Sequence, residues 1–257
     1  MSNIASPSPI RTIPEGRIYA TPADVCSALA HEWMLLAQEA IAARGAFHVA
    51  LSGGTTPRQL YERLAAPDYA FRLEWNRTFI YFGDERAVWP DDEQSNYRMA
   101  SEALLSRVSV PPAQVFRINA ERADLKKVAM DYSRLLAMTL PLAPNGMPQF
   151  DLLLLGMGDD GHVASLFPGT EALAEPRKLA LPVYVQRLDS WRVSLTFNVI
   201  NHARHVILLA CGKAKAAMVR RALREPPGAE PLPVQRVKPV GSALEWRLDK
   251  DAAALLK

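Results

Sequence analysis

The chain has 257 residues, 49% of them hydrophobic and 22% charged, and its formal net charge is +3 at pH 7. This composition is ordinary for a globular protein, and the scattered lysines and arginines indicate no nucleic-acid partner. The two cysteines form no C-x-x-C motif, no apolar run approaches the ~18 residues of a membrane span, and the first residues lack the hydrophobic segment of a signal peptide, so we expect no zinc site, no membrane segment and a cytoplasmic protein.

The start of the chain is rich in serine and proline, and we expect residues 1–16 to form a flexible N-terminal arm. Order is expected to begin near Arg17, with a short strand over residues 17–20. No linker divides the rest of the chain convincingly. Residues 17–257 are therefore predicted to form a single α/β domain.

A long helix is predicted over residues 22–44. Thr21 can cap its first turn, and Pro22 suits the first helical position because its missing N–H is not needed there. Gly45 can end the helix because glycine adopts the left-handed conformation common at helix ends.

An anion-binding turn is predicted after a buried strand at residues 47–51. The turn consists of Ser52, Gly53, Gly54, Thr55 and Thr56, and Pro57 opens a helix that runs to about Leu64. A glycine turn at a helix start offers free N–H groups and the positive end of the helix dipole to an anion. The turn lacks the G-K-[ST] of a nucleotide P-loop, which favours a single phosphate, although such turns are as often purely structural.

Charged residues also follow the next predicted strand, residues 78–82. Asp84, Glu85 and Arg86 come after Gly83, and Ser95 or Asn96 can cap a helix that continues through Leu105. Such a triplet is usually a solvated ion-pair cluster, but its place at a strand end makes a site plausible. A short strand at residues 115–118 and a helix at residues 120–140 follow.

The central stretch, residues 150–169, carries the strongest indication of a site. Four consecutive leucines predict a strand buried on both faces, and a glycine turn then brings out Asp159, Asp160 and His162. Residues 156–161 also spell G-x-G-x-x-G, but two adjacent aspartates would repel a pyrophosphate. A solvated capping loop is the other alternative, and three ionisable groups at the carboxyl end of a strand favour a site over it.

Two further strands are predicted at residues 179–185 and 192–197. A third begins at His205 and leads through Gly212 into a helix. Lys213 and Lys215 fall in the first turn of that helix, which is unfavourable for cations unless an anion is also present, so a phosphate ligand is favoured. Residues 242–248 are expected to form a last edge strand before a short helix.

Four motifs in this order and spacing resemble the 6-phosphogluconolactonase family, a relative of glucosamine-6-phosphate deaminase: SGGTTP, GDERAVWPDDEQSNYRMA, LLLLGMGDDGHVASLFPG and LTFNVINHARHVILLACGKAKA. The resemblance covers residues 17–249. It implies an α/β, modified Rossmann-like fold (NagB/RpiA-like) with a mostly parallel sheet sandwiched between helices. It also implies hydrolysis of 6-phospho-D-glucono-1,5-lactone to 6-phosphogluconate in the pentose phosphate pathway, without metal or cofactor.

Lactone opening requires a base for water, a stabilised oxyanion and an acid for the leaving ring oxygen. An imidazole can accept and return a proton, so His162 is the expected general base and then acid. The resemblance implies that Asp160 and Asp84 position the imidazole or the sugar hydroxyls and that Arg86 stabilises charge at the carbonyl. It also implies that the 52–56 turn, Arg192 and Lys215 bind the substrate phosphate.

Two other functions stay open. In the deaminase relative a glutamate follows the histidine by five residues and a tyrosine replaces Arg86; here the first position is Phe167, and both differences favour the lactonase. A non-catalytic sugar-phosphate sensor would need a DNA-binding module, which an arm of 16 residues cannot hold. A monomer is favoured over an oligomer.

Overall fold

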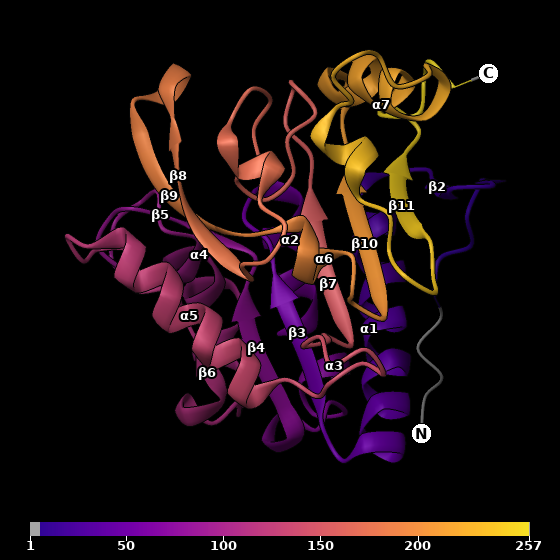
Figure 1. Cartoon of the computed structure of the whole chain (residues 1–257). Helices are drawn as coiled ribbons and strands as arrows, with labels where there is room; N and C mark the ends of the chain where they lie inside the picture. Colours follow the sequence, from indigo (N-terminus) through magenta and orange to yellow (C-terminus); the bar gives the residue numbers. More distant parts are fainter. Residues whose placement is uncertain (1–5, 257) are drawn as a thin grey trace.

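The computed structural model describes residues 6–256, which form two β-sheets with helices packed around them (Figure 1). The larger sheet has eight strands in the order β1-β2-β11-β10-β7-β3-β4-β6, and the smaller sheet has the order β5-β9-β8. The strands are β1 (Arg11–Ile13), β2 (Gly16–Tyr19), β3 (Phe47–Leu51), β4 (Thr78–Phe82), β5 (Asp84–Arg86), β6 (Val115–Phe116), β7 (Leu152–Gly156), β8 (Ala180–Val185), β9 (Ser190–Leu195), β10 (His205–Ala210) and β11 (Leu244–Asp249). Apart from the antiparallel β1–β2 pair, the strands of the larger sheet pair in parallel, which confirms the predicted mostly parallel α/β fold.

Helices cover both faces of the larger sheet. In Figure 1, α1 lies behind the sheet, whereas α5 and α6 lie in front of it. Within residues 6–256 no helix is long and apolar enough to cross a membrane. The α-helices are α1 (Pro22–Arg44), α2 (Thr55–Leu64), α3 (Pro67–Ala70), α4 (Asn96–Ala103), α5 (Leu125–Thr139), α6 (Phe197–Ile200) and α7 (Ala216–Arg224).

Helix α1 has the predicted bounds because Thr21 and Gly45 cap its two ends. Thr21 accepts a hydrogen bond from the backbone N–H of Asp24, whose side chain accepts one from the N–H of Thr21 in return. Gly45 ends the helix at a φ of 82°, a conformation that costs glycine little. The fully buried Trp33 packs edge-on against Phe47 at the start of β3, with ring centroids 5.7 Å apart.

Strand β7 lies at the centre of the larger sheet, between β10 and β3. Its four leucines are buried because neighbouring strands take its backbone groups and helices cover its side chains on both faces. Strands β3, β4, β7 and β10 all run in parallel, so the loops that follow them leave from one edge of the sheet. That edge is where ligands bind in open α/β sheets.

The expected flexible arm at residues 1–16 is wrong over its second half. Residues Arg11–Ile13 form β1, and β1 pairs with β2 and buries Ile13. The open edge of β2 supplies free backbone groups, and Ile13 gains from leaving water, so this short segment is ordered. Residues 1–5 lie outside the described range.

Asp84, Glu85 and Arg86 follow β4, and they form a short strand of their own, β5, which pairs antiparallel with β9 and was not among the predicted strands. The expectation of a last edge strand followed by a short helix is wrong. Strand β11 is interior, between β10 and β2, and turns rather than a helix follow it. Arg247 of β11 is fully buried in ion pairs with Glu32 and Glu245, which let a charged side chain occupy the interior of the sheet.

Candidate active site

The predicted site residues gather at the carboxyl edge of the larger sheet. Ser52 follows β3, Asp84 follows β4, His162 lies in the loop after β7, and Lys215 lies after β10 in the short helix η6 (Lys213–Lys215). Each strand ends in a glycine or a short turn that lets its polar residues leave the core. The fold therefore brings together groups that are up to 163 residues apart in sequence, from Ser52 to Lys215.

His162 and Asp160 form the centre of the site. The ring Nδ1 of His162 lies 2.6 Å from Oδ1 of Asp160, and the backbone N–H of His162 donates to the same oxygen over 3.1 Å. In the neutral ring, Nδ1 is therefore the donor, which leaves the Nε2 lone pair free to accept a proton. The carboxylate fixes both the orientation and the tautomer of the imidazole.

Gly158 makes room for this arrangement. A Cβ atom at residue 158 would lie 2.0 Å from Nδ1 of His162, so a larger side chain would displace the ring. The N–H of Gly158 also donates to the carbonyl of His162 over 2.9 Å, which closes the loop. The glycine run after β7 thus serves close packing around the imidazole, and the dinucleotide interpretation is unnecessary.

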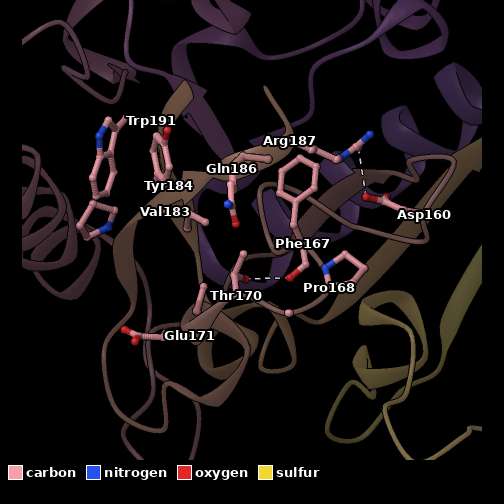
Figure 2. A pocket seen from close by; sticks show the side chains of 14 residues that line it. Asp160, Phe167, Pro168, Thr170, Glu171, Val183, Tyr184, Gln186, Arg187 and Trp191 are labelled. Atoms are coloured by element: carbon pink, nitrogen blue, oxygen red, sulfur yellow. Dashed lines mark hydrogen bonds and ion pairs between the residues drawn. The ribbon is translucent and has the colours of Figure 1, made fainter. Parts of the chain in front are cut away.

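Two residues that the sequence analysis left without a role hold the imidazole further. Phe167 stacks on the His162 ring with centroids 3.9 Å apart. Arg187, from the short helix η5 (Gln186–Leu188) between β8 and β9, places Nη2 3.0 Å from Oδ2 of Asp160 and lies over the Phe167 ring. Figure 2 shows the Arg187–Asp160 ion pair beside Phe167. No local sequence pattern near Arg187 predicts this contact, because it depends on where the fold places the β8–β9 hairpin.

These surroundings shift both titrations in the direction that suits a base. Burial lowers the pKa of His162, and the charges of Asp160 and Asp84 only partly oppose that effect. Burial works against ionisation of Asp160, yet hydrogen bonds from His162 and the charge of Arg187 hold its pKa below the ordinary value. At neutral pH the site therefore holds a neutral imidazole on an ionised carboxylate.

Asp84 is held separately and only by neutral donors. It is 7% exposed, and its Oδ2 accepts a 2.6 Å hydrogen bond from Oγ of Ser165 while its Oδ1 accepts one of 3.1 Å from Nδ2 of Asn96. The described contacts assign the imidazole to Asp160 and leave Asp84 beside it as a second carboxylate. The sequence alone does not separate the roles of Asp84 and Asp160, and it does not identify Ser165.

The glycine turn after β3 is rigidly tied to the sheet. Oγ of Ser52 accepts a hydrogen bond from the N–H of Gly156, and the hydroxyl of Tyr61 both donates to the Ser52 carbonyl and accepts from its N–H. Gly54, with φ of 110°, starts α2 without any side-chain cap, so the first N–H groups of that helix face outward uncapped. This geometry suits an anion.

The basic side chains fall into two groups. Nζ of Lys215 donates to the carbonyl of Met157, next to the glycine turn. Arg86 and Arg192 are direct cross-strand partners on β5 and β9, and Arg192 is only 8% exposed. Burial and the neighbouring Arg86 lower the pKa of Arg192, and Nε of each arginine is buried without a hydrogen-bond partner among the described residues. Arg86 does donate from Nη1 to the carbonyl of Gln94, but no carboxylate among the described residues forms an ion pair with either guanidinium group. Two adjacent guanidinium groups without a carboxylate partner indicate a place for an anionic or strongly polar ligand.

A cavity of about 830 Å³ opens beside Asp160. Asp160, Phe167, Tyr184, Arg187 and Trp191 are among its lining residues, as Figure 2 shows. His162, Ser52 and Lys215 do not line it, so the cavity meets the predicted site at Asp160. Among residues 6–256, no cluster of three or more histidine, cysteine, aspartate or glutamate side chains is arranged to hold a metal ion.

Comparisons with known proteins agree with this geometry. Residues 20–246 match the sequence model of the family described as glucosamine-6-phosphate isomerases/6-phosphogluconolactonase. The chain is 37% identical to 6-phosphogluconolactonase 3, chloroplastic, of Arabidopsis thaliana over 83% of its own length and 66% of that protein's length. It is also 37% identical to the 6-phosphogluconolactonase of a Synechocystis species, over 85% of this chain and 88% of that protein.

Solved structures give the same result. The 6-phosphogluconolactonase of Trypanosoma brucei superposes with a TM-score of 0.85 at 30% identity, covering 96% of this chain and 100% of that one. A monomeric glucosamine-6-phosphate deaminase superposes with a TM-score of 0.76 at 19% identity, which shows a shared fold only. The chain therefore belongs to the glucosamine-6-phosphate isomerase/6-phosphogluconolactonase family.

Proposed function

We propose that this protein is a 6-phosphogluconolactonase (EC 3.1.1.31), which hydrolyses 6-phospho-D-glucono-1,5-lactone to 6-phospho-D-gluconate in the oxidative branch of the pentose phosphate pathway. The observation that carries the proposal is the Asp160–His162 pair, whose short hydrogen bond leaves one imidazole nitrogen free as a base. Relatives named 6-phosphogluconolactonase, at 33–37% identity, support the same substrate.

The reaction follows from the arrangement of the side chains. Nε2 of His162 removes a proton from water as the water oxygen bonds to the lactone carbonyl carbon. The carbonyl oxygen becomes an oxyanion, and Arg86 stabilises its charge. The bond from that carbon to the ring oxygen then breaks, and the imidazolium returns its proton to the departing oxygen. Asp160 stabilises the imidazolium between the two transfers.

The substrate phosphate is assigned to Ser52, Gly53, Gly54, Thr55 and Thr56, with Lys215 and Arg192 as cationic partners. The uncapped start of α2 supplies N–H donors, and Lys215 supplies a charge held beside Met157. Asp84 is assigned to the sugar hydroxyls because its carboxylate is anchored apart from the imidazole. No step in this mechanism calls for a metal or an organic cofactor.

The alternative activity, deamination of glucosamine 6-phosphate, is disfavoured by one contact. The position five residues after His162 holds Phe167, whose apolar ring stacks on the imidazole where the deaminase relative uses a glutamate. A phenylalanine cannot help a histidine to open a sugar ring by proton transfer. A non-catalytic sensor is disfavoured because the base, its carboxylate and the arginine pair are all in place.

One assay separates these possibilities. The lactone is generated in situ, formation of 6-phosphogluconate is followed with a coupled dehydrogenase, spontaneous hydrolysis is subtracted, and ammonia release from glucosamine 6-phosphate is measured in parallel. Acceleration of lactone hydrolysis alone supports the proposal. Ammonia release would identify a deaminase, and phosphosugar binding without turnover would identify a sensor.

We also propose that the protein acts in the cytoplasm as a monomer, with one domain that includes the β1–β2 pair. The pairing of β11 with β2 joins the two ends of the chain in one sheet, which supports a single folding unit. Light scattering coupled to size-exclusion chromatography tests the oligomeric state, with a mass near 28.4 kDa expected for the monomer.

A further inference from the structure

Asn96 occupies a fixed position between the two halves of the site. It is the first residue of α4, it is 2% exposed, and its backbone N–H donates over 2.8 Å to Oε1 of the buried Glu85. The other oxygen of Glu85 accepts from the N–H of Tyr97 and the hydroxyl of Ser95. This carboxylate therefore anchors the start of α4 and determines where the Asn96 side chain lies.

One end of the Asn96 side chain orients Asp84. Its Nδ2 donates to the backbone carbonyl of Asp84 over 3.0 Å and to Oδ1 of the same residue over 3.1 Å. Oγ of Ser165 donates a hydrogen bond to the other carboxylate oxygen of Asp84. Asn96 and Ser165 thus hold the Asp84 carboxylate in one rotamer without adding a charge.

The other end of Asn96 lies against the glycine turn. A Cβ atom at residue 53 would lie 2.0 Å from Oδ1 of Asn96, and that oxygen is buried without a hydrogen-bond partner among residues 6–256. The backbone of Gly53 is not in the left-handed region, so the Asn96 side chain is what excludes alanine there. The position of the turn above β3 therefore depends on this amide.

We infer that Asn96 is a positioning residue that couples the phosphate-binding turn to Asp84, so that the phosphate and the sugar hydroxyls are held at a fixed separation from His162. The inference rests on the proposed lactonase function and on the roles assigned there to Gly53 and Asp84. Asn96 acts through these two residues and does not itself touch the substrate. Nothing in the local sequence marks it beyond its ability to cap a helix.

The sharpest test is Asn96→Asp, which keeps the shape and replaces the donor by a carboxyl group. Two carboxylates in contact raise the pKa of one of them, so at low pH the pair shares a proton and the introduced group still donates to Asp84. At higher pH both ionise and repel. The charged or titratable groups that also face Asp84 are His162, Glu85, Arg192 and Tyr61.

We expect kcat/KM of Asn96→Asp to fall roughly tenfold or more at about pH 8, with the deficit shrinking toward about pH 6. The matched control is Asn76→Asp, which adds the same charge at an exposed position at the opposite end of β4. The control should keep the wild-type pH profile. A purely structural role for Asn96 would scale the whole profile without changing its shape, and that result, or a wild-type profile, would overturn the inference.

A second experiment tests the inference even if Asn96→Asp does not fold. Gly53→Ala should raise KM in the wild-type background but have little further effect in the Asn96→Ala background, because the clash partner is gone. Additive effects would overturn the inference. A wild-type protein without lactonase activity would refute the proposed function instead, and the same cycle is then measured from calorimetric binding of 6-phosphogluconate.

Discussion

Arg187 Nη2 lies 3.0 Å from Oδ2 of Asp160, so the carboxylate that orients His162 is itself held from a separate hairpin. Arg187 also covers the ring of Phe167, with 5.2 Å from its Cζ atom to the ring centroid. The imidazole therefore depends on a chain of contacts that runs from the β8–β9 connection to the β7 loop. The charge of Arg187 favours the ionised form of Asp160 and disfavours the protonated form of His162.

Arg187→Met should shift the acidic limb of the kcat/KM profile to higher pH. The methionine keeps an unbranched apolar chain against Phe167 but removes the positive charge that helps to lower the pKa of His162. When that pKa rises, a smaller fraction of the imidazole is neutral at a given low pH, so activity falls there. Well above the pKa the base is neutral in both proteins, and their rates converge.

The control for this change is Arg177→Met, which removes an exposed arginine from the loop before β8. Its pH profile should match that of the wild type. If Arg187→Met left the acidic limb in place, the Arg187–Asp160 ion pair would be a surface contact without influence on the base.

His162→Ala should lower kcat at least ~100-fold while KM changes little, because the base acts in the transition state and the phosphate contacts lie elsewhere. Thermal unfolding of the variant, compared with the wild type, checks that the fold is intact. A folded His162→Ala enzyme with near-normal kcat would remove His162 from the mechanism. Asp160→Asn should also lower kcat strongly, since the amide no longer fixes the imidazole tautomer or stabilises the imidazolium.

Lys215→Ala should mainly raise KM. Nζ of Lys215 is fixed on the Met157 carbonyl beside the glycine turn, where it can meet a phosphate that the free N–H groups of α2 also bind. Its neighbour Lys213 is exposed in the same short helix, so Lys213→Ala is the matched control and should leave KM unchanged. Equal effects of both variants would indicate general electrostatic attraction instead of a specific contact.

The parts of the fold that are predictable from the sequence are those with local causes. Strands β3 and β4 have their predicted bounds because short, largely apolar runs end at serine or glycine. Helix α1 likewise follows from its caps. Strand β5 is not predictable from the sequence because its three charged residues are of a type usually exposed to solvent. Glu85 is nevertheless buried, and its carboxylate accepts hydrogen bonds from the start of α4.

In the site, too, the contacts with local causes are predictable and those made by the tertiary fold are not. His162 and Asp160 are two residues apart on a glycine turn, so their contact is readable from the sequence. Arg187 and Ser165 were missed because each reaches its partner only through the tertiary fold, Ser165 across 81 residues to Asp84. Such contacts leave no periodicity or motif, since the spacing between the partners is set by the packing of two sheets.

Tyr61→Phe should destabilise the protein by ~1–3 kcal/mol and also raise KM, because it removes both hydrogen bonds from the buried backbone groups of Ser52 at the base of the phosphate-binding turn. Tyr132→Phe is the matched control: its hydroxyl makes the same pair of bonds to Phe82, at the end of β4. Urea unfolding should show similar losses for both variants, whereas only Tyr61→Phe should weaken phosphate binding. A raised KM in both, or in neither, would show that the Tyr61 hydroxyl supports the sheet without placing the turn.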